Sequence, residues 1–291
     1  MPGPIICFGE ILWDVLPHGR FLGGAPLNVA YHLRRLGNNV RLVSALGRDA
    51  WGDEACERVR AAGLDTSAIG RVDLPTGAVD VTLDAAGQAS YQIRENVAWD
   101  AITARPQAGE PAPEALVFGS LALRGKANRE CLSLWLEARP RVRLCDLNLR
   151  PPFDDVSALD PWVRGSTILK VNEDEARRLS PQDLASAGPE KHALYLSEQY
   201  DCATVCVTLG AAGALVWSNG DVVRVPSPSV IVRDTIGAGD AFTAALLDGV
   251  LRDDGRDWEK RLRRACALGA FVASRDGAQP AYDPADVPGL A

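Results

Sequence analysis

Short apolar runs alternate with longer amphipathic segments along most of the chain. The apolar run at residues 4–9 ends in a glycine and predicts a buried strand. Residues 25–37 follow it, with Leu27 and Ala30 at the spacing of one helix face. A proline near the start and Gly37 at the end suit the two ends of a helix. The segment therefore predicts a strand followed by a helix.

The same alternation recurs as far as the C-terminal end of the sequence. Strands are predicted at residues 39–47, 115–120, 142–148, 167–172, 203–210 and 213–218. Helices are predicted at residues 50–63, near 127–139, from about 173, at about 238–252 and at 257–274. Strands that alternate with helices of this length indicate an α/β fold, in which a mostly parallel sheet is covered on both faces.

Two segments depart from this rhythm. Residues 75–94 alternate with period two around the sequence DAAGQ, which predicts a β-hairpin. Residues 10–24 read as short extended pieces around a Pro-His-Gly turn. We expect a small sheet that projects over a cleft, and therefore one domain spanning residues 1–291, with lid segments at about 10–24 and 75–96.

Composition narrows the class of protein. The chain has 291 residues, of which 47% are hydrophobic, and a formal net charge of -7. Because no block of Lys and Arg stands out, we expect no nucleic-acid partner and no membrane partner. No apolar run approaches the ~20 residues of a membrane span and no leader is evident. The seven scattered cysteines suit reduced core thiols, so a cytoplasmic location is expected.

Residues 234–247 combine three small residues with an acid at the predicted start of a helix. Gly237, Ala238 and Gly239 leave the backbone accessible, and Asp240 follows in the first turn. Unpaired amides and the helix dipole favour an anion at this place. Taken alone, the pattern also fits an ordinary capped helix start.

The full stretch, DTIGAGDAFTAALL, resembles the C-terminal signature of the PfkB (ribokinase-like) carbohydrate kinases. The resemblance implies that Asp240 is the catalytic base. It also implies that the amides from Gly237 to Asp240, including those of Ala238 and Gly239, form an anion hole for the phosphoryl group of ATP. Phosphoryl transfer needs positioning, charge stabilisation and an acceptor for the hydroxyl proton, and these residue types supply them.

A second stretch, GGAPLNVAYHLRRLG at residues 23–37, resembles the N-terminal signature of the same family. Gly23, Gly24 and Asn28 match residues that contact the sugar, and Asp14 matches an acid that binds its hydroxyls. Carboxylates and amides each grip neighbouring hydroxyl groups. Taken alone, the two glycines also fit a tight strand-to-helix turn.

Three further segments resemble the nucleotide side of the family's site. Asn172 and Glu175 match an N-x-x-E motif, which implies that Glu175 supports Mg²⁺ through water. Thr208, Gly210 and Gly213 match the strand-turn-strand that binds ATP. Residues 274–281 resemble a segment beside the adenine pocket and a monovalent-cation site, and Asp234 is a candidate residue for K⁺. Each motif alone also fits a helix cap or a glycine-rich hairpin.

The resemblance covers residues 4–282 and implies a ribokinase-like three-layer sandwich with a small β-sheet lid. Asp146, Asn148 and Arg150 match the D-x-N-x-R motif of the fructokinase branch. The implied reaction is transfer of the γ-phosphoryl group of MgATP to a primary hydroxyl of fructose. Leu12 stands where ribokinases carry a polar sugar-binding residue, which argues against ribose.

Alternatives remain open at this stage. A 2-keto-3-deoxygluconate kinase would use Arg94 and Arg150 to hold the carboxylate of its substrate, and a nucleoside kinase is the next candidate. A non-catalytic sugar or nucleotide sensor would retain the fold alone. An NAD-binding protein is disfavoured because residues 4–14 lack the GxGxxG pattern. Exposed lid strands also predict a homodimer.

Overall fold

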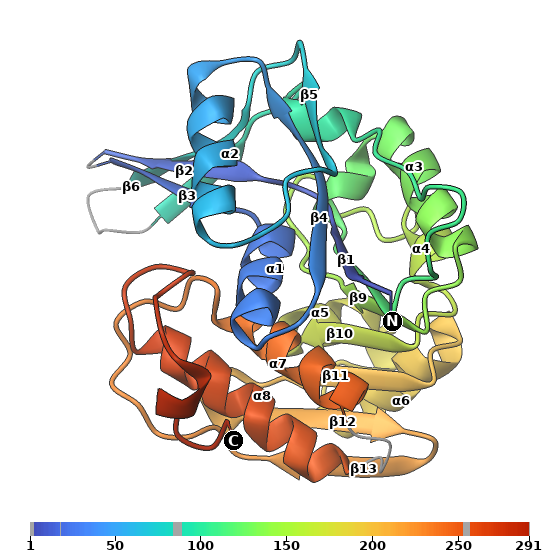
Figure 1. Ribbon diagram of the computed structural model, residues 1–291. Coiled ribbons are helices and arrows are strands. Elements are labelled where there is room, and N and C mark those ends of the chain that lie inside the picture. Colours follow the sequence, from blue (N-terminus) through green and yellow to red (C-terminus); the bar gives the residue numbers. More distant parts are fainter. Residues whose placement is uncertain (1–2, 18, 84–88, 253–256, 291) are drawn as a thin grey trace.

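A nine-stranded sheet forms the centre of the computed structural model, which describes residues 3–17, 19–83, 89–252 and 257–290 (Figure 1). The strand order is β13-β12-β11-β10-β9-β8-β1-β4-β5. The strands are β1 (Ile5–Phe8), β4 (Val40–Gly47), β5 (Ile69–Val72), β8 (Ala115–Phe118), β9 (Val142–Asp146), β10 (Ile168–Asn172), β11 (Thr204–Thr208), β12 (Ala214–Ser218) and β13 (Asp221–Val225). All neighbours pair in parallel except β11–β12 and β12–β13. The predicted α/β class with a mostly parallel sheet is confirmed.

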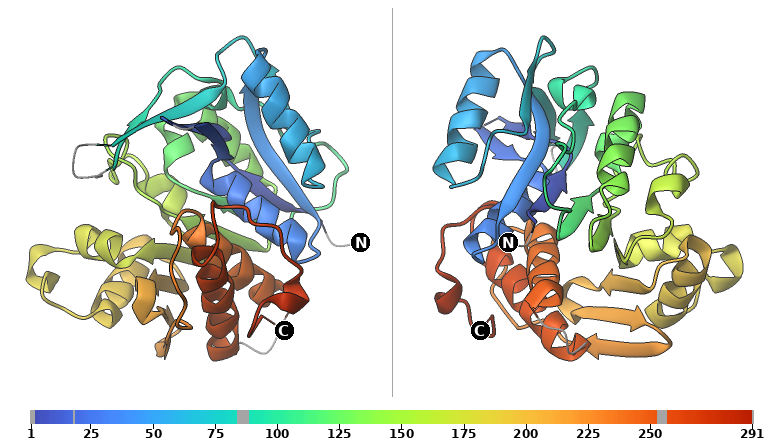
Figure 2. Two further views of the ribbon diagram at one scale, coloured as in Figure 1. Left: turned by 90° about the vertical axis from the view of Figure 1, so that its left-hand side faces the viewer. Right: turned by 45° about the vertical axis from the view of Figure 1, so that its right-hand side comes forward.

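Helices cover both faces of this sheet (Figures 1 and 2). They are α1 (Ala25–Arg35), α2 (Ala50–Ala61), α3 (Lys126–Glu137), α4 (Asp160–Val163), α5 (Glu173–Leu179), α6 (Pro189–Tyr200), α7 (Ala238–Arg252) and α8 (Trp258–Ala273). Cys7 belongs to the core that includes residues of α1, α2, α7 and α8, whereas its neighbours Ile6 and Phe8 belong to the core that includes residues of α3 to α6. Because side chains alternate along a strand, a strand that is apolar throughout contributes residues to the hydrophobic cores on both faces of the sheet.

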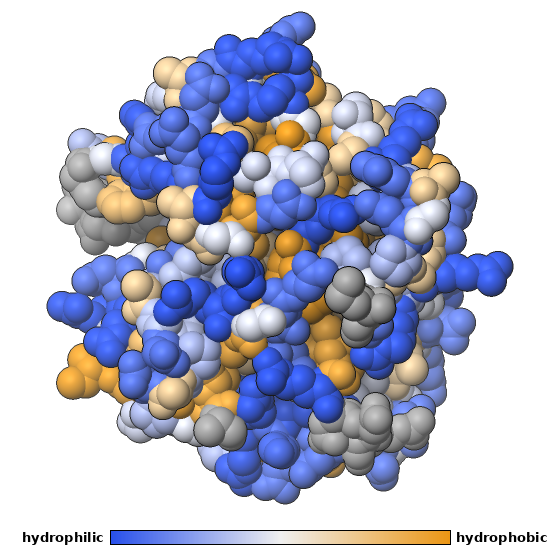
Figure 3. All heavy atoms as spheres, in the orientation of Figure 1, coloured by the Kyte–Doolittle hydropathy of each residue, from blue (hydrophilic) through white to orange (hydrophobic). Residues whose placement is uncertain are grey.

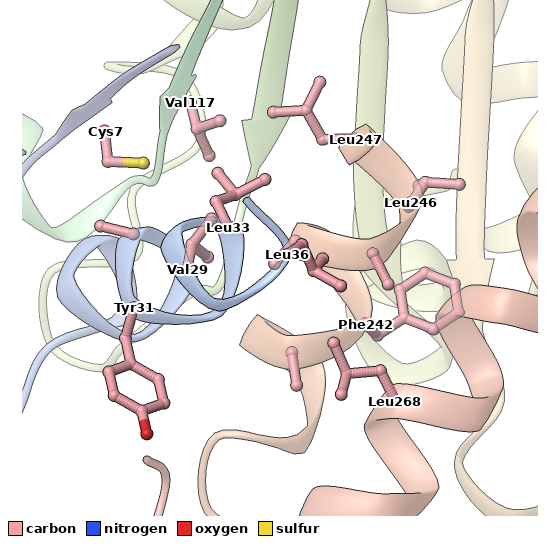
Figure 4. Close-up of a cluster of buried hydrophobic side chains, with 14 of the residues drawn as sticks. Cys7, Val29, Tyr31, Leu33, Leu36, Val117, Phe242, Leu246, Leu247 and Leu268 are labelled. Carbon is pink, nitrogen blue, oxygen red and sulfur yellow. The ribbon is translucent and has the colours of Figure 1, made fainter. Parts of the chain in front are cut away.

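The hydrophobic core on the face covered by α1, α2, α7 and α8 brings together residues from near the two ends of the chain. Figure 4 shows Leu33 of α1, and Leu36 directly after this helix, close to Phe242 and Leu246 of α7, with Leu268 of α8 beside them. All of these side chains are buried. The packing fixes the start of α1 next to the start of α7, although residues about 200 positions apart supply the two helices.

The helix predicted from about residue 173 is two helices in the structure. Asn172 caps α5, accepting a hydrogen bond from the amide of Glu175 at 2.9 Å. The helix ends at Leu179, just before Pro181, and Pro189 begins α6. Three other elements were not predicted from the sequence: β5, β13 and the short α4.

A second sheet of four strands, in the order β3-β2-β6-β7, projects from the body (Figure 1). Its strands are β2 (Leu12–Leu16), β3 (Gly19–Gly23), β6 (Gly77–Leu83) and β7 (Ala89–Ile93), so both predicted extended segments are confirmed. His18 and the predicted DAAGQ turn at 84–88 lie outside the described residues. We call this sheet the lid. The division into one kinase domain with a lid stays a prediction.

The carboxyl ends of three parallel strands meet at one edge of the central sheet. Asp146 ends β9, Asn172 ends β10 and Thr208 ends β11, and Asn172 pairs with Thr208 in register. Ligands of open α/β sheets bind at such an edge. None of the helices among the described residues has the length and apolar character needed to cross a bilayer.

Candidate active site

A cleft of about 680 Å³ lies between the lid and this edge of the central sheet. Figure 3 shows the molecule hollowed on its left-hand side, where the lid strands overhang the C-terminal segments. The residues predicted for the site that line the cleft are Asp14, Gly24, Asn28, Arg150, Asn172, Thr208, Gly237, Gly239 and Asp240. The structure therefore gathers residues from both ends of the chain around one space.

Asp240 lies in the first turn of α7 and faces the cleft. Burial and, to a smaller extent, the nearby Asp146 carboxylate raise its pKa to about 6. A hydrogen bond from Asn28 opposes this rise, as do the positive charges of Lys170 and Arg150. A carboxylate with this pKa is ionised at neutral pH, yet basic enough to accept a proton.

The loop before α7 exposes backbone amides next to Asp240. Among the described residues, the amides of Gly237 and Gly239 have no hydrogen-bond acceptor, whereas the amide of Ala238 donates to the carbonyl of Thr235 at 3.3 Å. A side chain on Gly237, whose φ is 76°, would place its Cβ 2.4 Å from that of Ala278. Glycine is thus required for the turn that leaves these amides open to an anion.

Asp234 anchors this loop. Its two carboxylate oxygens accept from the amides of Ile236 at 2.9 Å and Gly277 at 3.1 Å. The side chain holds the loop against the segment after α8 and does not line the cleft. Its role at a K⁺ site therefore stays a prediction.

The part of the cleft lined by residues near the start of the chain carries two carboxyl groups. Asp14, on β2, was predicted from the sequence, whereas Glu10, in the loop after β1, was not. Burial raises the pKa of Asp14 to about 6 and that of Glu10 to about 7. Glu10 accepts from the amide of Ala25 at 3.3 Å, so it also ties this loop to the start of α1.

Gly23 and Gly24 allow the chain to pass close to these acids. A Cβ on Gly23 would lie 2.9 Å from Oδ2 of Asp14, and a Cβ on Gly24 would lie 2.4 Å from the carbonyl oxygen of Glu10. Gly24 also has a φ of 114°, which disfavours other residues. Gly24 lines the cleft, whereas Gly23 lies next to the Asp14 carboxylate and outside the cleft lining.

A buried cluster of charges lies below Asp240. The ammonium group of Lys170 contacts both oxygens of Asp146, at 2.9 and 3.0 Å, and both side chains are under one-tenth exposed. The hydroxyl of Thr243 donates to Asp146 at 2.7 Å and is 2.9 Å from the carbonyl of Gly239. Lys170 also lines the cleft. The sequence does not single Lys170 out as a site residue, because it lies within an apolar strand.

Arg94 is outside the cleft lining, unlike Arg150. Its guanidinium donates to both oxygens of Asp80, at 2.8 and 2.7 Å, on the lid face opposite Asp14 and Val79. Arg150 lines the cleft, and among the described residues its guanidinium group has no hydrogen-bond or ion-pair partner. The structure thus does not bring the two arginines together.

The remaining predicted residues lie around the cleft or behind it. Glu175 is buried, and its oxygens accept from the amides of Leu149 at 2.7 Å and Asn172 at 2.9 Å. Gly210 and Gly213 shape the turn between β11 and β12, beyond Thr208. Among the described residues no group of three or more His, Cys, Asp or Glu side chains is placed to hold a metal ion.

Trp13 and Trp99 belong to the hydrophobic cores. Trp13 is fully buried and donates to the carbonyl of Trp51 at 3.1 Å. Trp99 is 1% exposed and packs with Leu12, Val79 and other apolar residues of the lid. Neither lines the cleft.

The model of the pfkB family of carbohydrate kinases matches residues 18–285 of the sequence. The chain belongs to this family. A sugar kinase of Pyrococcus horikoshii is 33% identical over 298 residues, which cover 95% of this chain and 92% of that protein. A fructokinase of Rhizobium leguminosarum bv. trifolii is 31% identical, over 86% of this chain and 80% of its own length.

One solved structure resembles this protein over nearly the whole length of the chain. The fructokinase of Xylella fastidiosa with bound ATP has a TM-score of 0.83 and 26% identity, and the match covers 96% of this chain and 94% of that one. The chain is an ATP-dependent sugar kinase with a ribokinase-like fold, and so a phosphotransferase that acts on a sugar hydroxyl.

Proposed function

We propose that this carbohydrate kinase is a fructokinase, which transfers the γ-phosphoryl group of ATP to a primary hydroxyl of fructose. The observation that carries the proposal is Asp240, an ionisable carboxylate in the cleft beside the open amides of Gly237 and Gly239. Two similar proteins are fructokinases. Leu12 in the cleft lining offers no polar contact where a ribokinase would carry one.

Each side of the cleft has a role in this proposal. Asp14, Gly24 and Asn28 bind the sugar hydroxyls under the lid. Asn172 and Thr208 would lie toward the nucleotide. Mg²⁺ bound with ATP would neutralise phosphate charge, and Glu175 would act on it through water. Asp240 accepts the proton of the attacking hydroxyl. The amides of Gly237 and Gly239, and Lys170 beside them, face the transferred negative charge.

The charges in the cleft favour a neutral sugar over a sugar acid. A carboxylate held by two arginines would need Arg94 as well as Arg150, but Arg94 is engaged by Asp80. Glu10 and Asp14 would also repel a substrate carboxylate. The unpartnered Arg150 is the one observation that favours 2-keto-3-deoxygluconate, which remains the second candidate.

The test is ADP formation by the purified protein with MgATP and a panel of acceptors: fructose, 2-keto-3-deoxygluconate, ribose, glucose, tagatose and adenosine. The proposal expects the highest kcat/KM with fructose. A preference for the keto acid would replace it with the second candidate, and a preference for adenosine would indicate a nucleoside kinase. Repeating the assay with and without K⁺ tests the cation prediction at Asp234.

The lid offers a surface for the proposed homodimer. Phe21 on β3 is 50% exposed and Tyr91 on β7 is 61% exposed, and both strands lie at the edges of the lid. Edge strands with exposed aromatic residues pair readily with a second copy. Sedimentation equilibrium of the wild-type protein and of Phe21→Ser tests this proposal, because weaker association of the variant is expected.

A further inference from the structure

The amide of Asn28 is held at both ends by side chains from distant parts of the chain. Its Nδ2 donates to Oδ2 of Asp240 at 2.8 Å, and its Oδ1 accepts from Nε2 of Gln279, also at 2.8 Å. Asn28 is only 4% exposed. An amide has one donating and one accepting end, so whichever group faces one end decides what the other end offers.

Gln279 belongs to a segment, residues 277–282, that is held against α1 by hydrogen bonds. The hydroxyl of Tyr31 donates to the carbonyl of Pro280 at 2.9 Å, and Figure 4 shows its ring pointing out of the apolar core. Nε2 of His32 lies 3.0 Å from the carbonyl of Ala278, and its Nδ1 lies 3.0 Å from the hydroxyl of Tyr282.

The protonation state of His32 follows from these contacts. Burial lowers the pKa of His32 to about 4, so the ring is neutral at physiological pH. Because a carbonyl only accepts, Nε2 carries the proton and Nδ1 accepts from Tyr282. Three hydrogen bonds made by Tyr31 and His32 thus hold the segment 277–282, which contains Gln279, against α1.

We propose that Gln279 is a positioning residue for Asp240, which acts by fixing the orientation of the Asn28 amide. With the Gln279 NH₂ group facing Asn28, the Asn28 carbonyl turns toward Gln279 and its NH₂ group turns toward Asp240. The opposite orientation would set a carbonyl oxygen against a carboxylate oxygen. The inference rests on the proposed role of Asp240 as the base and adds the residue that keeps this base ionised.

The consequence is electrostatic. The Asn28 hydrogen bond stabilises the charged form of Asp240 against desolvation and against the Asp146 carboxylate on β9. Glu10, in the loop after β1, adds a further acid facing Asp240. Lys170 on β10 and Arg150 after β9 act in the same direction as Asn28. If the Asn28 amide turns over, a favourable contact becomes a repulsive one and Asp240 binds its proton more tightly.

The test is the pH dependence of kcat at saturating MgATP and sugar for Gln279→Met, which removes the donor without adding charge. We expect the apparent pKa on the acidic side of the kcat profile to rise by about 1 to 2 pH units, the effect of losing a hydrogen bond to a charged group. When Asn28 is already replaced by alanine, adding Gln279→Met should leave the pH profile unchanged, because the side chain that links Gln279 to Asp240 is then missing.

A matched control and a second variant complete the design. Gln182 is exposed and lies outside the cleft lining, so Gln182→Met should retain the wild-type profile. If Gln279→Met does not fold, the isosteric Gln279→Glu offers only acceptors and is expected to raise this apparent pKa. The Asn28→Ala background then reveals how much of the rise comes from the added charge.

Two results would overturn the inference. One is a folded Gln279→Met enzyme whose acidic limb coincides with that of the wild type. The other is an equal shift in the presence and absence of Asn28. The turnover of Asp240→Asn distinguishes this failure from failure of the proposed base. Full turnover in Asp240→Asn would show that Asp240 is not the base. Lost turnover in Asp240→Asn, together with an unchanged pH profile in the Gln279 variants, would overturn only the positioning role of Gln279.

Discussion

Asn28 and Asp240 are joined by a 2.8 Å hydrogen bond, although 212 positions separate them in the sequence. Asn28 lies in the first turn of α1 and Asp240 in the first turn of α7. The two helices pack side by side on one face of the central sheet. The parts of the cleft lined by α1 and by α7 therefore share one polar contact, supported by one apolar core.

Turnover should fall in acid because the proposed base must be ionised. The pKa of Asp240 is raised to about 6, so its active, deprotonated form predominates above that pH and is lost below it. We expect kcat to fall about tenfold for each unit below pH 6. A profile measured with both substrates saturating checks this. A plateau that continues down to about pH 4 would contradict it.

Replacing the two arginines should have unequal effects on activity. Arg150→Met removes a guanidinium that lines the cleft, and we expect kcat/KM to fall by at least about tenfold, or ~1.4 kcal/mol. Arg94→Met breaks a partly exposed pair with Asp80, and should cost less than about 1 kcal/mol of stability with kcat/KM within about twofold. Equal losses in the two variants would show that the lid arginine also reaches the substrate.

Lys170→Met should destabilise the protein because it leaves Asp146 buried without its partner. Both side chains are under one-tenth exposed, and breaking such a pair costs about 3 to 5 kcal/mol. Urea unfolding measures the loss. The double variant Asp146→Asn with Lys170→Met should recover much of it, and a double variant as unstable as the single one would argue against the ion pair as the cause.

Glu175→Gln should weaken the loop that carries Arg150. The two oxygens of Glu175 accept from the amides of Leu149 and Asn172, and glutamine would turn an NH₂ group toward one of these donors. We expect a loss of about 1 to 3 kcal/mol in the free energy of unfolding. Titrating Mg²⁺ in the same variant tests the predicted metal role, since a metal contact would also raise the Mg²⁺ concentration needed for half-maximal rate.

Local sequence patterns predicted the elements well where the signal lay within the element itself. The start of α7 at Ala238 followed from small residues before an apolar run, and the parallel sheet followed from apolar strands alternating with helices. The strand β5 escaped prediction because it has only four residues and one buried side chain, Ile69. Strand β13 escaped because exposed residues dominate it.

The site was harder to predict, because its partners meet only in the folded chain. Lys170 looked like an interruption of an apolar strand until the register set it beside Asp146. Glu10 was not singled out in any motif, and Gln279 lay in the segment 274–281 without a role of its own. The positions of both depend on α1 lying between them. The engagement of Arg94 by Asp80 depends on the pairing of β6 with β7.

The most direct test of the account is the turnover of Asp240→Asn, with MgATP and the preferred sugar at saturation. We expect a folded protein that still binds ATP and in which kcat has fallen by about 10²–10⁴-fold, the contribution of a general base. Turnover within a few-fold of the wild type would contradict it, because the proton of the sugar hydroxyl would then have another acceptor.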